Sequence, residues 1–209
     1  MVEDQNFLRV KQSFFLIIFF FIFQSNSFSQ NYNFQKLIEI DGPWGSSFIN
    51  NNELIFTEKN GKIKIVDINS KRISEIKHNL NYLVHGQGGL LDILFKDNFI
   101  YISYSENRGN GQSSTSIAKA KFNKNKLNFK NIFQAEPPIN SGYHFGSRLA
   151  IKGNNLFASA GERGKGMIAQ DPTKHPGSII RINLDGSIPG DNPAFRDYPN
   201  WLPEIYVIG

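Results

Sequence analysis

One histidine, His144, lies between two glycines, Gly142 and Gly146, in a stretch that leads into an apolar segment. A neutral imidazole, whose ordinary pKa is about 6.5, can take the proton of an alcohol at neutral pH. The flanking glycines would let the backbone approach a flat ligand closely. On residue type alone, a surface or hydrogen-bonded histidine is the commoner role, so the neighbours of His144 decide its chemistry.

Two further glycine-rich loops carry polar side chains. Gln87 lies in residues 86–89, and Glu162 in residues 161–166. A carboxamide can donate or accept hydrogen bonds. Taken alone, residues 86–89 are most simply explained as a tight turn. Glu162 is equally well explained by a surface ion pair with Arg163. The second loop lacks the Lys-Ser/Thr ending of a phosphate-binding P-loop, and no helix is expected after it.

The sequence provides no convincing metal site. The oxygen-rich residues 183–193 lack the alternating ligands and closing Glu of an EF-hand loop, and turn chemistry explains them. His78, His85 and His175 have no partners at metal-ligand spacing and are interpreted as structural or surface residues. No metal ligand is assigned. Cysteine is absent, which excludes thiol catalysis and disulfides.

Composition is ordinary for a globular protein: 209 residues, 40% hydrophobic, 20% charged, and a net charge of +5. The lysines are scattered, which favours a solvated surface over a nucleic-acid patch.

The N-terminus has the pattern of a secretory signal peptide. Arg9 and Lys11 precede an apolar run over residues 14–23. Ten residues span about 15 Å as a helix, half of the roughly 30 Å hydrocarbon core. We predict a signal peptide over residues 1–29 and an exported, periplasmic or secreted domain over residues 30–209. An uncleaved membrane anchor is the alternative.

After the leader, short apolar runs alternate with Gly-, Asn- and Asp-rich turns, and no segment of ten residues shows helical periodicity. The expected strands cover residues 46–49, 54–58, 63–68, 90–95, 99–105, 117–122, 127–133, 148–151, 156–160, 179–183 and 204–208. We therefore predict an all-β chain. Similar strands begin at residues 54, 99 and 156, which are 45 and 57 residues apart, close to the period of four-stranded propeller blades. A propeller would bring the loops at Gln87, His144 and Glu162 to its central axis.

Three segments together resemble one family. They are Gly-Gln-Gly-Gly-Leu-Leu-Asp at 86–92, Gly-Tyr-His-Phe-Gly-Ser-Arg-Leu at 142–149, and Gly-Ser-Ile-Ile-Arg-Ile-Asn-Leu-Asp-Gly-Ser-Ile-Pro at 177–189. The chain is similar to the glucose/sorbosone dehydrogenases that use pyrroloquinoline quinone (PQQ), including soluble aldose sugar dehydrogenases. The resemblance implies a six-bladed β-propeller, of which this chain would form about three blades.

The resemblance also implies roles for residues. His144 matches the general base, which sits over the quinone, and Gln87 matches a glutamine that hydrogen-bonds the quinone. Glu162 corresponds to an acid near the sugar pocket, where the family usually has Asp, and Tyr143 is expected beside the substrate. Calcium is implied as a second cofactor, with most of its ligands outside this sequence.

Two departures from the family pattern matter. Tyr143 occupies a place where the glucose-oxidising branch carries an acid and many aldose-type members carry Arg, so substrate preference does not transfer. Residues 204–209 resemble the strand that leads into a His-Arg-Asn-Pro-Gln-Gly cofactor segment, which is absent. We therefore expect a truncated product or an incomplete sequence, inactive by itself.

The function implied is PQQ-dependent oxidation of an aldose at its C1 hydroxyl to a lactone, with electrons passing to an external acceptor. A non-catalytic propeller that binds carbohydrate or protein is the alternative, and a calcium-dependent lactonase is a third possibility. The sequence specifies neither the sugar, the acceptor nor the oligomeric state.

Overall fold

The computed structural model describes residues 32–209. The predicted signal peptide over residues 1–29 lies outside the described residues. Residues 37–209 form one compact unit that contains every strand the structure describes. Of the other unit, residues 1–36, only 32–36 are described, and they form no regular element. None of the helices within residues 32–209 is long and apolar enough to cross a membrane.

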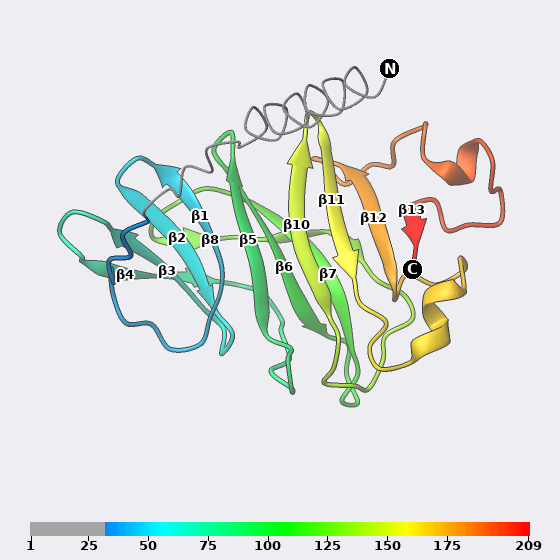
Figure 1. The fold of residues 1–209 in the computed structure, drawn as a ribbon, viewed down its shortest axis with the longest axis horizontal. Coiled ribbons are helices and arrows are strands. Elements are labelled where there is room, and N and C mark those ends of the chain that lie inside the picture. The colour runs from blue at the N-terminus through cyan, green and yellow to red at the C-terminus, as the bar shows by residue number, and fades with distance from the viewer. Residues whose placement is uncertain (1–31) are drawn as a thin grey trace, which may run out of the picture. The chain divides into compact units, whose positions relative to one another are not determined.

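The strands form three sheets (Figure 1). The first sheet contains β1 (Pro43–Asn50), β2 (Glu53–Glu58), β3 (Lys62–Asp67), β4 (Ile73–His78) and the short β8 (Lys126–Leu127). The second contains β5 (Leu90–Lys96), β6 (Phe99–Asn107), β7 (Ser113–Lys121) and β9 (Lys130–Gln134). The third contains β10 (Gly146–Lys152), β11 (Asn155–Ala160), β12 (Ser178–Asn183) and β13 (Ile205–Ile208).

Each sheet is built on antiparallel neighbours in chain order, and β8 adds to β4 in parallel. The first strands of the three sheets, β1, β5 and β10, lie next to one another. Successive four-stranded sheets with their first strands adjacent are the blades of a β-propeller. The all-β prediction is confirmed, and the chain forms part of a propeller with three blade-like sheets.

Two hydrophobic cores hold the sheets together. The core between the first and second sheets contains Ile55, Ile63, Leu90, Ile102 and Leu127 among others, each with no exposed surface. The core between the second and third sheets includes Tyr101, Ile117, Leu156, Ile180 and Ile205. β-Branched and aromatic residues dominate both cores, as expected for strands that pack on a pleated surface.

The expected strand over residues 127–133 is wrong as a single element. The structure divides it between two sheets: β8 pairs with β4, and β9 pairs with β7. Leu127 and Phe129 pack in the first core whereas Phe133 packs in the second, so the chain crosses between blades here. Strand β4 is not predicted by the sequence, because Ile76 is the only buried residue in it. The helices within residues 32–209 are two short 3₁₀ turns, η1 (Gly166–Gln170) and η2 (Pro193–Phe195).

Buried polar groups connect the second and third sheets near the start of β10. The Asp92 carboxylate accepts hydrogen bonds from the Leu149 N–H (2.8 Å) and from the Arg148 guanidinium (3.0 Å). The Thr115 hydroxyl donates to the Phe145 carbonyl (2.8 Å). Since a buried carboxylate without such partners would be unfavourable, these bonds fix the loop that precedes β10 relative to β5 and β7.

Candidate functional site

The loop that carries Gln87 is hydrogen-bonded to the loop that carries His144. The Gln87 N–H donates to the Gly142 carbonyl (2.7 Å), and the His144 N–H donates to Oε1 of Gln87 (2.8 Å). The backbones approach so closely that a Cβ at Gly86 would lie 2.4 Å from the Gly142 oxygen, and Gly86 has φ +57°. Only glycine tolerates both conditions, so the Gly-Gln-Gly-Gly pattern serves this contact.

His144 has φ +47°, an uncommon conformation for a residue with a Cβ, and its side chain is 54% exposed. Its Nδ1 contacts Oε1 of Glu162 at hydrogen-bonding distance. An ionised carboxylate only accepts hydrogen bonds, so this partner places the proton of a neutral imidazole on Nδ1. Nε2 is then the basic nitrogen, and it makes no hydrogen bond to any residue in 32–209.

Glu162 is held in its ionised form. The hydrogen bond from His144, above all, lowers the pKa of this carboxyl below its ordinary value, and the Gly164 N–H also donates to Oε1 (3.1 Å). The second oxygen, Oε2, has no hydrogen-bond donor among the described residues. Glu162 thus orients His144, and its expected contact with substrate stays a prediction.

Arg163 is a buried residue that supports the loop carrying His144. The sequence does not predict its burial. The surface ion pair with Glu162 is not formed, because Arg163 is only 2% exposed. Its guanidinium donates to the carbonyls of Tyr143 (3.1 Å), Ser113 (2.9 Å) and Ser141, and to the Ser113 hydroxyl (3.0 Å). Burial lowers its pKa to about 10. The guanidinium also lies 3.6 Å from the centre of the Phe145 ring, a cation–π contact.

Tyr143 is 63% exposed, and its ring meets the His144 imidazole edge-on with 6.2 Å between centroids. Tyr143 also borders a cavity of about 420 Å³ together with His85, Asn140 and Lys165. Gln87, His144 and Glu162 do not line this cavity. The four predicted site residues therefore come together in one place, on an open surface beside the cavity.

His78 and His175 make their hydrogen bonds to residues other than His144. His175 is buried between the second and third sheets, where Nδ1 accepts the Glu136 N–H (2.9 Å) and Nε2 faces Glu204 (3.3 Å). His78 contacts the Gly61 carbonyl through Nε2 (2.8 Å). No group of three His, Cys, Asp or Glu side chains within the described part of the chain is placed to hold a metal ion.

The donor set suits a flat ligand with carbonyl or carboxylate oxygens. Because Oε1 of Gln87 accepts the His144 N–H, the NH₂ of this exposed carboxamide is left as a donor with no acceptor among the described residues. The Lys165 ammonium borders the neighbouring cavity and adds positive charge. This arrangement can donate to anionic oxygens and accept one proton at Nε2.

Comparison with known proteins identifies the family of this chain. The Glucose / Sorbosone dehydrogenase family model matches residues 40–209. Aldose sugar dehydrogenase YliI of Escherichia coli K12 is 29% identical over 169 residues, which cover 76% of this chain and 46% of that protein. The apo crystal structure of the soluble aldose sugar dehydrogenase from Escherichia coli superposes with a TM-score of 0.74 at 30% identity, covering 79% of this chain and 50% of that one.

The PQQ-bound aldose sugar dehydrogenase of Streptomyces coelicolor shares the fold, with a TM-score of 0.67 at 22% identity, over 81% of this chain and 50% of that one. The chain spans about half the length of the curated relatives it matches. Since the family model covers nearly all of the described residues, the chain belongs to the glucose/sorbosone dehydrogenase family.

Proposed function

We propose that this chain provides the base and part of the cofactor site of a PQQ-dependent sugar dehydrogenase, which oxidises an aldose at its C1 hydroxyl to a lactone. One observation carries the proposal: Nδ1 of His144 is occupied by the Glu162 carboxylate while Nε2 is free of protein partners within residues 32–209. A histidine held in this way presents its basic nitrogen outward, as a general base requires.

Oxidation of the C1 carbon removes a proton from the hydroxyl and a hydride from the carbon, leaving a C=O bond. In the proposal, Nε2 of His144 takes the proton. The imidazolium formed is stabilised by the Glu162 carboxylate at Nδ1, in the same way that a buried carboxylate assists histidine in hydrolytic triads. PQQ, when bound, would be the two-electron acceptor of the hydride.

Gln87 and His144 would hold the cofactor. The fixed Gln87 carboxamide offers N–H donors to a quinone oxygen, and the exposed His144 ring offers its face and Nε2. Support comes from the family membership and from the Streptomyces coelicolor neighbour, whose structure is PQQ-bound. Calcium is proposed from the resemblance alone, and no residue of this chain is assigned to it.

The proposed substrate is a small sugar, and an external molecule accepts the electrons. Tyr143 and Glu162 are the proposed substrate contacts, since both contact the imidazole of His144. The proposal also includes export of the domain after cleavage near residue 29. The residues concerned lie outside the described part of the chain.

The test is a titration with PQQ of the complete dehydrogenase of which this chain is proposed to provide part, followed by turnover with an aldose and a dye acceptor. The proposal predicts saturable, stoichiometric uptake and dye reduction that depends on both PQQ and sugar. Sugar binding with neither PQQ uptake nor dye reduction would favour the non-catalytic, carbohydrate-binding propeller. Hydrolysis of a lactone without PQQ would favour the lactonase.

A further inference from the structure

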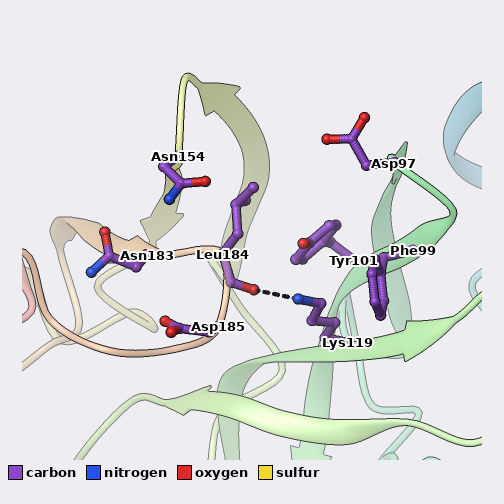
Figure 2. A pocket seen from close by; sticks show the side chains of 8 residues that line it. All are labelled: Asp97, Phe99, Tyr101, Lys119, Asn154, Asn183, Leu184 and Asp185. Carbon is purple, nitrogen blue, oxygen red and sulfur yellow. Dashed lines mark hydrogen bonds between the residues drawn. The ribbon is translucent and has the colours of Figure 1, made fainter.

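A second cavity lies between the second and third sheets, away from the His144 loops (Figure 2). Strands β5 and β10 start at the Gln87 and His144 loops, and the turns at their other ends carry Asp97 and Asn154, which border this cavity. Its volume is about 390 Å³, within the range of small-ligand sites. The cavity is therefore separated from the proposed catalytic site by the length of these strands.

Tyr101 supplies a hydroxyl group at the cavity. The residue is 2% exposed, and its hydroxyl makes no hydrogen bond to any residue in 32–209. Figure 2 shows the hydroxyl pointing across the cavity toward Leu184. Tyr104, on the same strand and equally buried, instead donates to Oδ1 of Asn131 (2.7 Å). The Tyr101 hydroxyl is therefore open to a hydrogen bond with a ligand in the cavity.

Lys119 is held in place beside Tyr101. Its Nζ donates to the Leu184 carbonyl (2.9 Å) and lies 4.2 Å from the ring centre of Phe99 and 5.3 Å from that of Tyr101. Phe99, Tyr101 and Lys119 share one face because Tyr101 pairs with Lys119 across β6 and β7. An ammonium has three N–H donors, and the Leu184 carbonyl uses one of them. The remaining donors are available to a ligand without movement of the side chain.

The charges around the cavity select for a neutral ligand. Asp97 and Asp185 lie on the same lining as Lys119. An anion would be repelled by the two carboxylates, and a cation attracted by them would share the lining with the Lys119 ammonium. A hydroxyl group satisfies both, because it donates to a carboxylate and accepts from an ammonium. Phe99 and Leu184 supply an apolar surface for the carbon skeleton of such a ligand.

We propose that this cavity binds a neutral polyhydroxylated ring, such as a sugar, with the Tyr101 hydroxyl as its central hydrogen-bonding partner. The site does not depend on PQQ or on His144. It would give the protein a place to hold a carbohydrate at a distance from the reaction.

Residue-resolved NMR of the isotope-labelled chain tests this, with methyl glucoside as the probe. Its C1 oxygen is methylated, so it cannot undergo oxidation at a C1 hydroxyl, and binding is separated from the proposed catalysis. We expect saturable shifts at the amides of residues 97–101 and 183–185, with a dissociation constant on the order of 1–10 mM. Shifts confined to residues near His144 would overturn the proposal while leaving the proposed function intact.

Two tyrosine variants and two charged probes complete the test. Tyr101→Phe should weaken binding about fivefold, because one hydrogen bond is lost without a change of shape. Tyr104→Phe, the matched control on the same strand, should bind as the wild type does. Methyl glucuronide and methyl glucosaminide should bind more weakly than methyl glucoside. Absence of saturation up to about 100 mM, equal binding by Tyr101→Phe, or tighter binding of a charged probe would each overturn the proposal.

Discussion

The backbone N–H of His144 donates a 2.8 Å hydrogen bond to the side-chain oxygen of Gln87, 57 residues earlier in the chain. This bond joins the loop before β5 to the loop before β10, and so joins two sheets at the candidate site. It also fixes which end of the Gln87 carboxamide faces outward. The two residues assigned to the cofactor from sequence are therefore parts of one hydrogen-bonded unit.

Replacement of Gln87 by Ala removes both this bond and the outward N–H donors. We expect sugar oxidation with PQQ to fall by about a hundredfold, because displacement of a reacting group by about 1 Å has an effect of that size. The measurement is steady-state dye reduction at saturating PQQ. Gln112→Ala is the matched control: Gln112 is a loop glutamine with no side-chain hydrogen bond among the described residues, and its loss should leave the rate unchanged. Equal rates for both variants would contradict the assigned role of Gln87.

Glu162→Gln tests the carboxylate behind His144. The amide keeps the shape but cannot stabilise an imidazolium through charge, so the maximal rate should fall about tenfold or more. Glu162→Asp, which restores the acid usual in the family, should retain most of the rate. A maximal rate unchanged in Glu162→Gln would show that this carboxylate does not act through His144.

Arg163→Lys tests the buried support. Lysine keeps the charge but cannot reproduce the planar set of donors that reaches Ser113, Ser141 and Tyr143. Buried carbonyls would be left unpaired, and we expect the free energy of unfolding to fall by about 3 kcal/mol. Urea denaturation measures this, with the exposed Arg196→Lys as the control. A loss under about 0.5 kcal/mol, the size of an ordinary surface change, would contradict the structural role.

The contact of Glu204 with His175 predicts an acid-dependent loss of stability. The hydrogen bond from His175 is the largest cause of a lowered pKa for the Glu204 carboxyl, so the fold favours its ionised form. The stabilisation is then fully present above the ordinary pKa of 4.5 and is lost as pH falls through the lower folded pKa. Wild-type stability should therefore fall more steeply below about pH 5 than that of Glu204→Gln. Urea melts at several pH values measure the difference, and Glu75→Gln, at an exposed acid, is the control. Parallel curves for wild type and Glu204→Gln would refute the link.

Much of the fold was predictable from sequence, because each strand that packs in a core carries its own apolar run and turn signals. The strands at residues 54–58, 99–105 and 156–160 were found for this reason, and the structure confirms them as β2, β6 and β11. Strand β4 was missed because it buries only Ile76, and β8 was misplaced because pairing with β4 depends on distant residues. Local patterns contain no information about which sheet a two-residue strand joins.

In the candidate site, too, local motifs were predictable from the sequence and contacts between distant residues were not. Gln87, His144, Tyr143 and Glu162 were found through motifs, and the structure brings them together. The burial of Arg163 was not predictable, since its partners come from two other parts of the chain and arginine is rarely buried. The unpaired Tyr101 hydroxyl likewise emerges only when two sheets are packed side by side.

The most direct test compares the complete dehydrogenase, of which this chain is proposed to provide part, with its His144→Ala variant, both at saturating PQQ, in a single-turnover reaction with an aldose. Reduction of the bound cofactor should fall by at least a thousandfold in the variant, within the range expected for loss of a general base. Uptake of PQQ should remain measurable in both proteins, because Gln87 is retained. Cofactor reduction at the wild-type rate in His144→Ala would contradict the account, since the proton of the C1 hydroxyl would then leave by another route.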